Sequence, residues 1–199
     1  MKLKTLSTRT LVIGIIAASM FLLALFFDIF QKNSSARLIE NFDKNFTQEQ
    51  LGRGLPMRLK IPKINVDSDV ESVGLAPDSS IGVPRERENV AWFNTGSRPG
   101  DNGSAIIVGH YGINNKKTSA FDNLHRLRKG DKLYVEDDKG VVTTFVVREN
   151  RRYDPDADSS SVFGPNDGKS HLNLVTCEGT WDEENQQYTK RLVVFTDKE

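Results

Sequence analysis

HLNLVTCEGTW, residues 171–181, is the stretch that says most about the fold of this 199-residue chain. Its first half is an apolar run rich in strand-forming residues, and it leads to Cys177, the only cysteine in the sequence. A short apolar run of this kind predicts a buried β-strand. We expect the strand to present the thiol at its end, while a buried and chemically inert cysteine is the alternative.

Similar short apolar segments recur from Met57 onward, separated by clusters of glycine, proline, asparagine and aspartate. This even spacing of strands and turns predicts an all-β domain, built as an antiparallel barrel or sandwich. One hairpin turn is expected at Asp138–Gly140. One short helix, with Ser119 as its N-cap, is expected within residues 119–131. The predicted strands cover residues 57–61, 89–93, 104–110, 132–136, 141–150, 172–177 and 188–196.

The N-terminus carries a different signal. Residues 11–27 are all apolar or small, and Lys2, Lys4 and Arg9 precede them. Such a segment predicts a transmembrane helix whose basic flank stays in the cytoplasm, and a cleaved signal peptide is the alternative. We therefore expect a cytoplasmic tail and membrane anchor at residues 1–30, a polar stalk at 31–55, and an extracellular globular domain at 56–199.

The composition narrows the range of functions. The 27 basic and 27 acidic residues cancel, and no dense cluster of lysine and arginine occurs, so we expect no nucleic-acid partner. A single cysteine in an exported domain indicates a free reactive thiol or an intermolecular bridge. A thiol oxidoreductase is excluded, because its Cys-x-x-Cys motif needs a second cysteine.

One histidine occupies a place equivalent to that of the cysteine. The apolar run at residues 104–109 ends on His110, just as the run before Cys177 ends on a polar residue and the thiol. Strand ends hold side chains rigidly where substrate can reach them, so this pair is a candidate nucleophile and acid/base. The alternative is an ordinary hydrogen-bonded histidine at a strand end.

An arginine completes this set. In YTKRLVVFT, residues 188–196, strand alternation places Arg191 on one face with Val193 and Phe195. A guanidinium among apolar side chains could stabilise a developing oxyanion, and a solvated edge-strand arginine is the alternative. Thr176 and Trp181, which flank the cysteine, are candidate substrate-binding residues.

The other polar clusters predict no metal or cofactor site. DPDAD, residues 154–158, has alternating carboxylates but lacks the glycine and the glutamate of an EF-hand loop. A solvated acidic loop is therefore expected. His125 and His171 are expected to be structural or exposed. Residues 151–170 show no periodicity and predict a long functional loop.

Four motifs, in this order, resemble those of the sortases, a family of membrane-anchored cysteine transpeptidases: PGDNGSAIIVGH, FDNLHRLRKGD, NLVTC and KRLVVF. The resemblance covers about residues 57–196 and the N-terminal anchor. It implies a closed eight-stranded barrel with one or two short helices, and catalytic roles for His110, Cys177 and Arg191. The family usually has Thr or Ser where this chain has Asn173, which leaves the subclass open. Because some sortases bind calcium near the loop that contains DPDAD, the resemblance also makes a calcium site there, with Glu86 or Glu88 as partners, the alternative to a solvated acidic loop.

The resemblance also implies a two-step reaction on a Leu-Pro-x-Thr-Gly-like sorting signal of secreted proteins. Cys177 would attack the Thr–Gly carbonyl to give a thioacyl enzyme, with His110 as acid and base and Arg191 at the oxyanion. An amine of a cell-wall precursor or of a pilin subunit would then take the acyl group. The alternative is a non-enzymatic, membrane-tethered β-domain for adhesion or assembly, in which the thiol is inert.

The basic residues before the apolar segment predict that the chain from about Lys32 onward lies outside the cell. Protease added to intact cells should therefore remove the domain, as followed by immunoblotting, while a cytoplasmic protein stays whole. Survival of the domain when an exported control protein is digested would contradict this orientation.

Overall fold

The computed structural model describes residues 53–112, 118–165 and 167–199, so the expected membrane anchor lies outside the described residues. In this part of the chain the strands are β1 (Pro56–Ile61), β2 (Val66–Val73), β3 (Val90–Phe93), β4 (Gly103–Gly109), β5 (Lys132–Asp137), β6 (Val142–Tyr153), β7 (Ser170–Asp182) and β8 (Gln187–Lys198).

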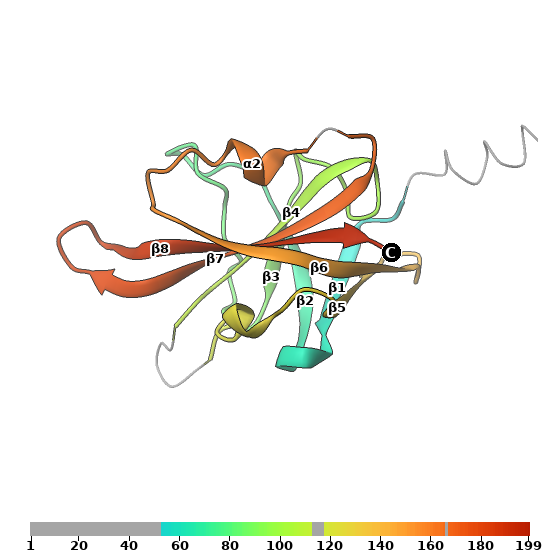
Figure 1. Ribbon diagram of the computed structural model, residues 1–199, viewed down its shortest axis with the longest axis horizontal. Helices are drawn as coiled ribbons and strands as arrows, with labels where there is room; N and C mark the ends of the chain where they lie inside the picture. The colour runs from blue at the N-terminus through green and yellow to red at the C-terminus, as the bar shows by residue number, and fades with distance from the viewer. Residues whose placement is uncertain (1–52, 113–117, 166) are drawn as a thin grey trace, which may run out of the picture. The chain divides into compact units, whose positions relative to one another are not determined.

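These strands close into a barrel in the order β1-β2-β3-β4-β7-β8-β6-β5 (Figure 1). The pairs β2–β3 and β4–β7 are parallel, and the other neighbouring pairs are antiparallel. The predicted hairpin joins β5 to β6, where Glu136 pairs with Val142 and Gly140 has a φ of 76°. The prediction of a closed, eight-stranded, all-β domain is confirmed, but the wholly antiparallel arrangement expected from the spacing of the strands is wrong, because these two pairs are parallel.

Strand β2 is the one that the hydrophobic pattern does not predict. Its sequence, VDSDVESV, places Val66, Ser68 and Val70 on one face, so the buried face contains a polar residue. That residue, Ser68, is 4% exposed, and its hydroxyl donates to the carbonyl oxygen of Glu88 at 2.6 Å. Because the hydroxyl has a partner, it can be buried at little cost. A search for apolar alternation therefore misses this strand.

The helix expected within residues 119–131 is only a 3-10 turn, η2 (Leu124–Arg126). Ser119 does not cap it, because its hydroxyl donates to the carbonyl oxygen of Gly112 at 2.6 Å. The backbone N–H of Ser119 donates to the Asp122 carboxylate at 2.9 Å. These contacts close the segment into turns against the chain that follows β4. The apolar face is as predicted, and the fully buried residues are Phe121, Leu124 and Leu127.

The strands bury different residues on their two faces. One face lines the barrel interior, where the core includes Leu172 and Leu174 of β7 and Leu192 and Val194 of β8. The alternate residues form a second apolar cluster on the outer face of β3, β4, β7 and β8. We call this the outer cluster, and its buried members are Ala91, Phe93, Ile106, Val108, Val162, Val193 and Phe195.

The loop between β6 and β7 covers this outer cluster with the short helix α2 (Ser160–Phe163), which lies over β4 in Figure 1. Two buried contacts hold it there. The Asn173 amide donates to the carbonyl oxygen of Val162 at 2.6 Å, and the Ser104 hydroxyl donates to that of Gly164 at 2.7 Å. Asn173, where the sequence departs from the usual family pattern, therefore anchors the loop.

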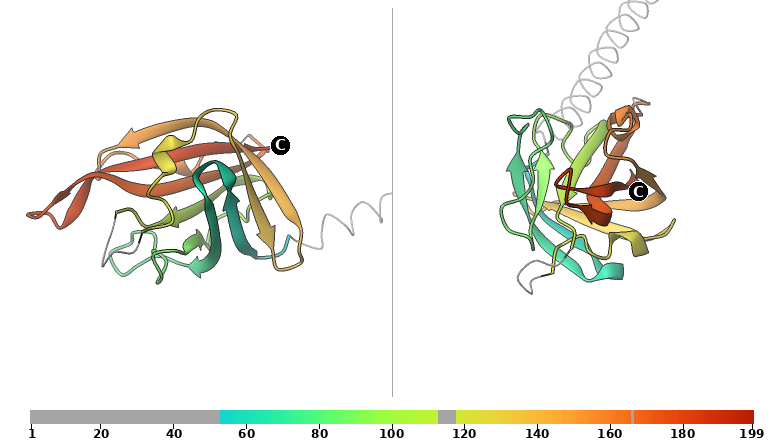
Figure 2. Two further views of the ribbon diagram at one scale, coloured as in Figure 1. Left: turned by 90° about the horizontal axis from the view of Figure 1, so that it is seen from below. Right: turned by 90° about the vertical axis from the view of Figure 1, so that its left-hand side faces the viewer.

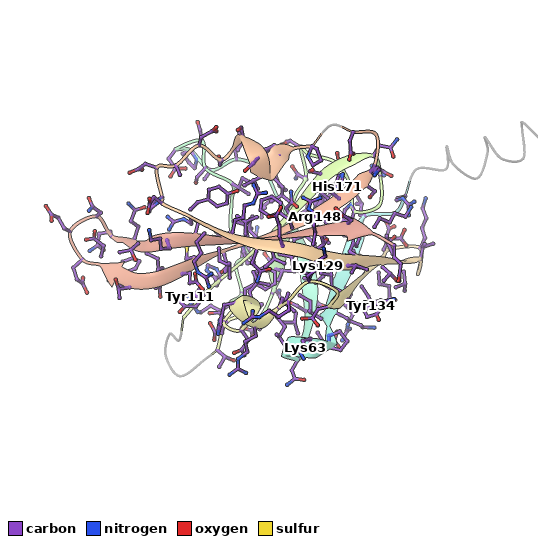
Figure 3. The ribbon with its side chains drawn as sticks, viewed as in Figure 1. Lys63, Tyr111, Lys129, Tyr134, Arg148 and His171 are labelled. Carbon is purple, nitrogen blue, oxygen red and sulfur yellow. The ribbon has the colours of Figure 1, made fainter. Side chains whose placement is uncertain are left out.

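The end of the same loop is fixed by a buried histidine. His171 is 2% exposed, and its ring nitrogens lie 2.8 Å from an Asp197 oxygen and 3.0 Å from an Asp167 oxygen. Arg148 donates to the same Asp197 oxygen at 2.7 Å, and it lies beside His171 in Figure 3. His171 is therefore structural, as expected from the sequence.

Gly109, at the end of β4, has no room for a side chain. A Cβ atom there would lie 2.5 Å from the ring of Phe121, which is fully buried. We expect Gly109→Ala to destabilise the domain by about 1–3 kcal/mol, because overpacking a closed core forces backbone shifts. Gly74→Ala is the matched control, since the nearest atom would be 3.9 Å away. Equal midpoints for the two variants in urea unfolding would contradict this.

Candidate active site

The parallel pairing of β4 with β7 brings the candidate histidine and cysteine together. Val108 pairs with Val175, and both strands run in the same direction. His110 and Cys177 each lie two residues further on, so they are level with one another. Adjacent strands are about 4.8 Å apart. The two segments therefore lie side by side, but the two positions are not equivalent, because His110 lies just past the end of β4 and Cys177 lies inside β7.

The antiparallel pairing of β7 with β8 adds the arginine. Cys177 and Arg191 are direct partners across the two strands, which places their Cβ atoms about 5 Å apart. On the next strand, Arg191 pairs with Tyr153 of β6. These residues share the face that carries the outer cluster. His110, Cys177 and Arg191 lie two residues from Val108, Val175 and Val193 respectively, and Tyr153 itself packs against the cluster.

Cys177 lies within a strand and not at its end, which corrects the expectation from the sequence. Strand β7 continues to Asp182 through an irregularity between Glu178 and Trp181, where Gly179 has a φ of 89°. The positive φ suits glycine and allows a bulge. The β7–β8 hairpin thus extends beyond the thiol, and it projects from the barrel in Figures 1 and 2.

Thr176 points to the other face of β7 and is 4% exposed. Its hydroxyl donates to the carbonyl oxygen of Gly109 at 2.7 Å. Thr176 directly precedes Cys177, and Gly109 directly precedes His110. The hydrogen bond therefore fixes the spacing of β4 and β7 at the site. Substrate contact by Thr176 stays a prediction.

The imidazole of His110 has a defined hydrogen-bond partner. The half-buried ring places Nε2 at 2.9 Å from the carbonyl oxygen of Pro84. A carbonyl oxygen only accepts, so Nε2 carries a hydrogen. This contact fixes the tautomer of the neutral ring and leaves Nδ1 as the nitrogen that can take up a proton.

The thiol of Cys177 is half-buried and free of any disulfide. Burial raises its pKa above the ordinary value, because the interior disfavours the thiolate, and the positive charge of Arg191 lowers it in part. Burial is the larger of the two effects. The resting residue is therefore a neutral thiol at pH 7, and it must lose a proton before it can act as a nucleophile.

The guanidinium of Arg191 is turned back along its own strand. It donates to the carbonyl oxygens of Tyr188 and Lys190 at 2.8 and 3.2 Å, and to the Gln187 side chain at 3.2 Å. Among the described residues these contacts take three of its five N–H donors. The guanidinium is thus held in a fixed orientation, close enough to Cys177 for its charge to lower the pKa of the thiol.

An aromatic row follows the site along the hairpin. The rings of Tyr111 and Tyr188, and those of Tyr188 and Trp181, meet edge to face with centroids 5.3 Å apart. Tyr111, labelled in Figure 3, directly follows His110. Trp181 is 45% exposed, so it remains accessible to a substrate.

The part of the chain that the structure describes contains neither a metal-binding cluster nor a membrane-spanning helix. Over residues 53–112, 118–165 and 167–199, no group of three or more His, Cys, Asp or Glu side chains is arranged to hold a metal ion. In the same ranges, no helix has the length and apolar character to cross a membrane.

Comparison with known proteins assigns the fold to one family. The family model of the Sortase domain matches residues 59–199. This chain belongs to the sortase family. Its members are cysteine transpeptidases, so the domain is an enzyme and not the non-enzymatic alternative. No curated protein sequence gives a significant match.

Solved sortase structures share the architecture. Sortase C-1 of Actinomyces oris is 25% identical, with a TM-score of 0.56 over 71% of this chain and 72% of that one. Sortase A of Corynebacterium diphtheriae is 20% identical, with a TM-score of 0.56 over 74% and 62% of the two chains. Sortase C1 of Streptococcus agalactiae is 23% identical, with a TM-score of 0.56 over 71% and 67%.

Three contributors to the site of this sortase were missed in the sequence. Tyr153 lies beside Arg191, and its hydroxyl is 2.8 Å from that of Ser161 in α2. Arg87 and Asp122 bind the backbone that follows His110. In the sequence, Arg87 and Asp122 look like ordinary polar residues in turns, and nothing distinguishes them from solvated polar residues.

The pKa of Cys177 can be tested by alkylation, because only the thiolate reacts. We expect the iodoacetamide reaction to have its pH midpoint above that of a free cysteine, about 8.5. Arg191→Met should move the midpoint higher still, because it removes the positive charge that lowers this pKa. A wild-type midpoint below that of glutathione, measured alongside, would contradict the burial effect.

Proposed function

We propose that this sortase cleaves a Leu-Pro-x-Thr-Gly-like sorting signal between Thr and Gly. Cys177 is the nucleophile, His110 the acid and base, and Arg191 the oxyanion donor. The observation that supports this most is their alignment across β4, β7 and β8 on one face of the sheet. A core cysteine with no chemical role has no need of an arginine as its cross-strand partner.

The raised pKa of the thiol defines the first step. Cys177 loses its proton to Nδ1 of His110, and the thiolate attacks the Thr carbonyl carbon. The carbonyl oxygen becomes an oxyanion, which the guanidinium of Arg191 stabilises. The imidazolium then gives its proton to the nitrogen of the departing Gly as the C–N bond breaks. A thioester on Cys177 remains.

The second step reverses these roles. An amine attacks the thioester carbon, and His110 takes a proton from that amine. The thiolate leaves as the new amide bond forms, and it regains a proton from the imidazolium. The acceptor is an amine of a cell-wall precursor or of a pilin subunit, so the reaction joins a secreted protein to the cell surface.

The outer cluster supports an apolar signal. Val175 lies two residues before Cys177 and packs against this cluster, so an apolar floor leads to the thiol. Phe163 of α2 is 51% exposed and meets Phe93 edge to face at 6.4 Å. Leu and Pro side chains of a sorting signal would bury apolar surface here. The anchor at residues 1–30 would hold the domain at the outer face of the membrane.

The assignment is tested by transfer of a Leu-Pro-x-Thr-Gly peptide to an amine, followed by mass spectrometry. Cys177→Ala should fold but show no transfer and no acyl adduct. His110→Ala and Arg191→Ala should each lose about 100-fold or more in rate. Arg191→Lys should stay impaired, because it keeps the charge without the planar donors. Turnover by Cys177→Ala, or an adduct on another residue, would rule the mechanism out.

A further inference from the structure

The segment Pro84–Arg87 contacts both the imidazole of His110 and the chain that follows it. The carbonyl oxygen of Pro84 accepts from Nε2 of His110 at 2.9 Å. Three residues further on, a terminal nitrogen of Arg87 donates to the carbonyl oxygens of Tyr111 and Gly112 at 2.9 and 2.8 Å. One short segment therefore fixes the ring and the two residues after it.

The contacts of Gly112 complete this arrangement. Its N–H donates to the Asp122 carboxylate at 2.7 Å, and its carbonyl oxygen also accepts from the Ser119 hydroxyl at 2.6 Å. A Cβ atom at Gly112, where φ is 85°, would lie 2.4 Å from the hydroxyl oxygen of Tyr188. The backbone directly after His110 is thus held from several sides, and Arg87 supplies the only charged donor among these contacts.

The setting of Arg87 indicates a specific role. The residue is half-buried, and its Nε atom is buried with no hydrogen-bond partner among the described residues. Burying an unpaired N–H of a charged group is unfavourable. The cost is offset by the charge-assisted hydrogen bonds to the two carbonyl oxygens. A solvated surface arginine would show neither feature.

We propose that Arg87 is a positioning residue for His110. It acts through the backbone of Tyr111 and Gly112, and it sets where Nδ1 lies relative to the thiol of Cys177. The proposal rests on the acid and base role of His110 in the proposed function. A misplacement of about 1 Å in such a group can cost roughly 100-fold in rate.

Arg87→Met tests this, because it keeps an unbranched stem and removes the donors. We expect single-turnover acylation by the peptide to slow by about 10- to 100-fold, with the half-saturating peptide concentration changed by less than about 2-fold. In a His110→Ala background, Arg87→Met should slow acylation by less than about 2-fold, because positioning has no value without the imidazole. Equal fold-losses in both backgrounds would overturn the proposal.

Arg128→Met is the matched control. Arg128 also donates from one terminal nitrogen to two backbone carbonyl oxygens, those of His125 and Leu127, at 2.7 and 2.8 Å. Among the described residues, no hydrogen bond joins Arg128 or its two acceptors to His110, so acylation should stay within about 2-fold of wild type. A loss for Arg128→Met as large as that for Arg87→Met would show a general effect on the fold, and so would contradict positioning.

The failure of this proposal and that of the proposed function have different signatures. If His110→Ala acylates at the wild-type rate, the acid and base role itself is wrong. If His110→Ala is slow but Arg87→Met is not, only the positioning role is wrong. Arg87→Lys, a shorter single-point donor, should be impaired less than Arg87→Met and should be equally non-additive with His110→Ala. If Arg87→Met fails to fold, the result for Arg87→Lys tests the positioning role in its place.

Discussion

The parallel pairing of β4 with β7 is the contact on which the rest of this sortase depends. Parallel strands advance together, so the pairing of Val108 with Val175 also brings His110 level with Cys177. A slip of one residue would turn one of the two side chains to the opposite face. The hydrogen bond from Thr176 to Gly109 and the close packing of Gly109 on Phe121 hold the register directly before the site.

Successive side chains of a strand point to opposite faces, so the residues that form the barrel core differ from those that lead to the site. Interior residues of β7 and β8 form the main core, while the alternate residues carry the outer cluster and lead to Cys177 and Arg191. Reactive groups can therefore lie on strands that are fixed by a closed core on their other face. The α2 loop, anchored through Asn173 and Ser104, covers part of the outer cluster on this same face.

The electrostatics of the site favour a thiol that is inert until it is engaged. Burial raises the pKa of Cys177 more than Arg191 lowers it, so the resting enzyme holds little thiolate at neutral pH. A surface thiolate would be open to oxidation and to unspecific attack. In the proposed mechanism this thiol becomes nucleophilic only when its proton passes to His110. The position of that imidazole, held by Pro84 from a loop distant in sequence, is then as important as its presence.

The sequence by itself determined seven of the eight strands, the hairpin at Asp138–Gly140, and the pattern that places His110 and Cys177 after apolar runs and Arg191 among alternating apolar residues. These features follow from local periodicity and turn chemistry, which neighbouring residues encode. Only the tertiary structure decided that Ser68 allows β2 to be buried, that Ser119 closes a turn and not a helix, and that β7 continues past the thiol. The physical reason is that each depends on hydrogen bonds or strand pairing with another segment, which no local pattern contains.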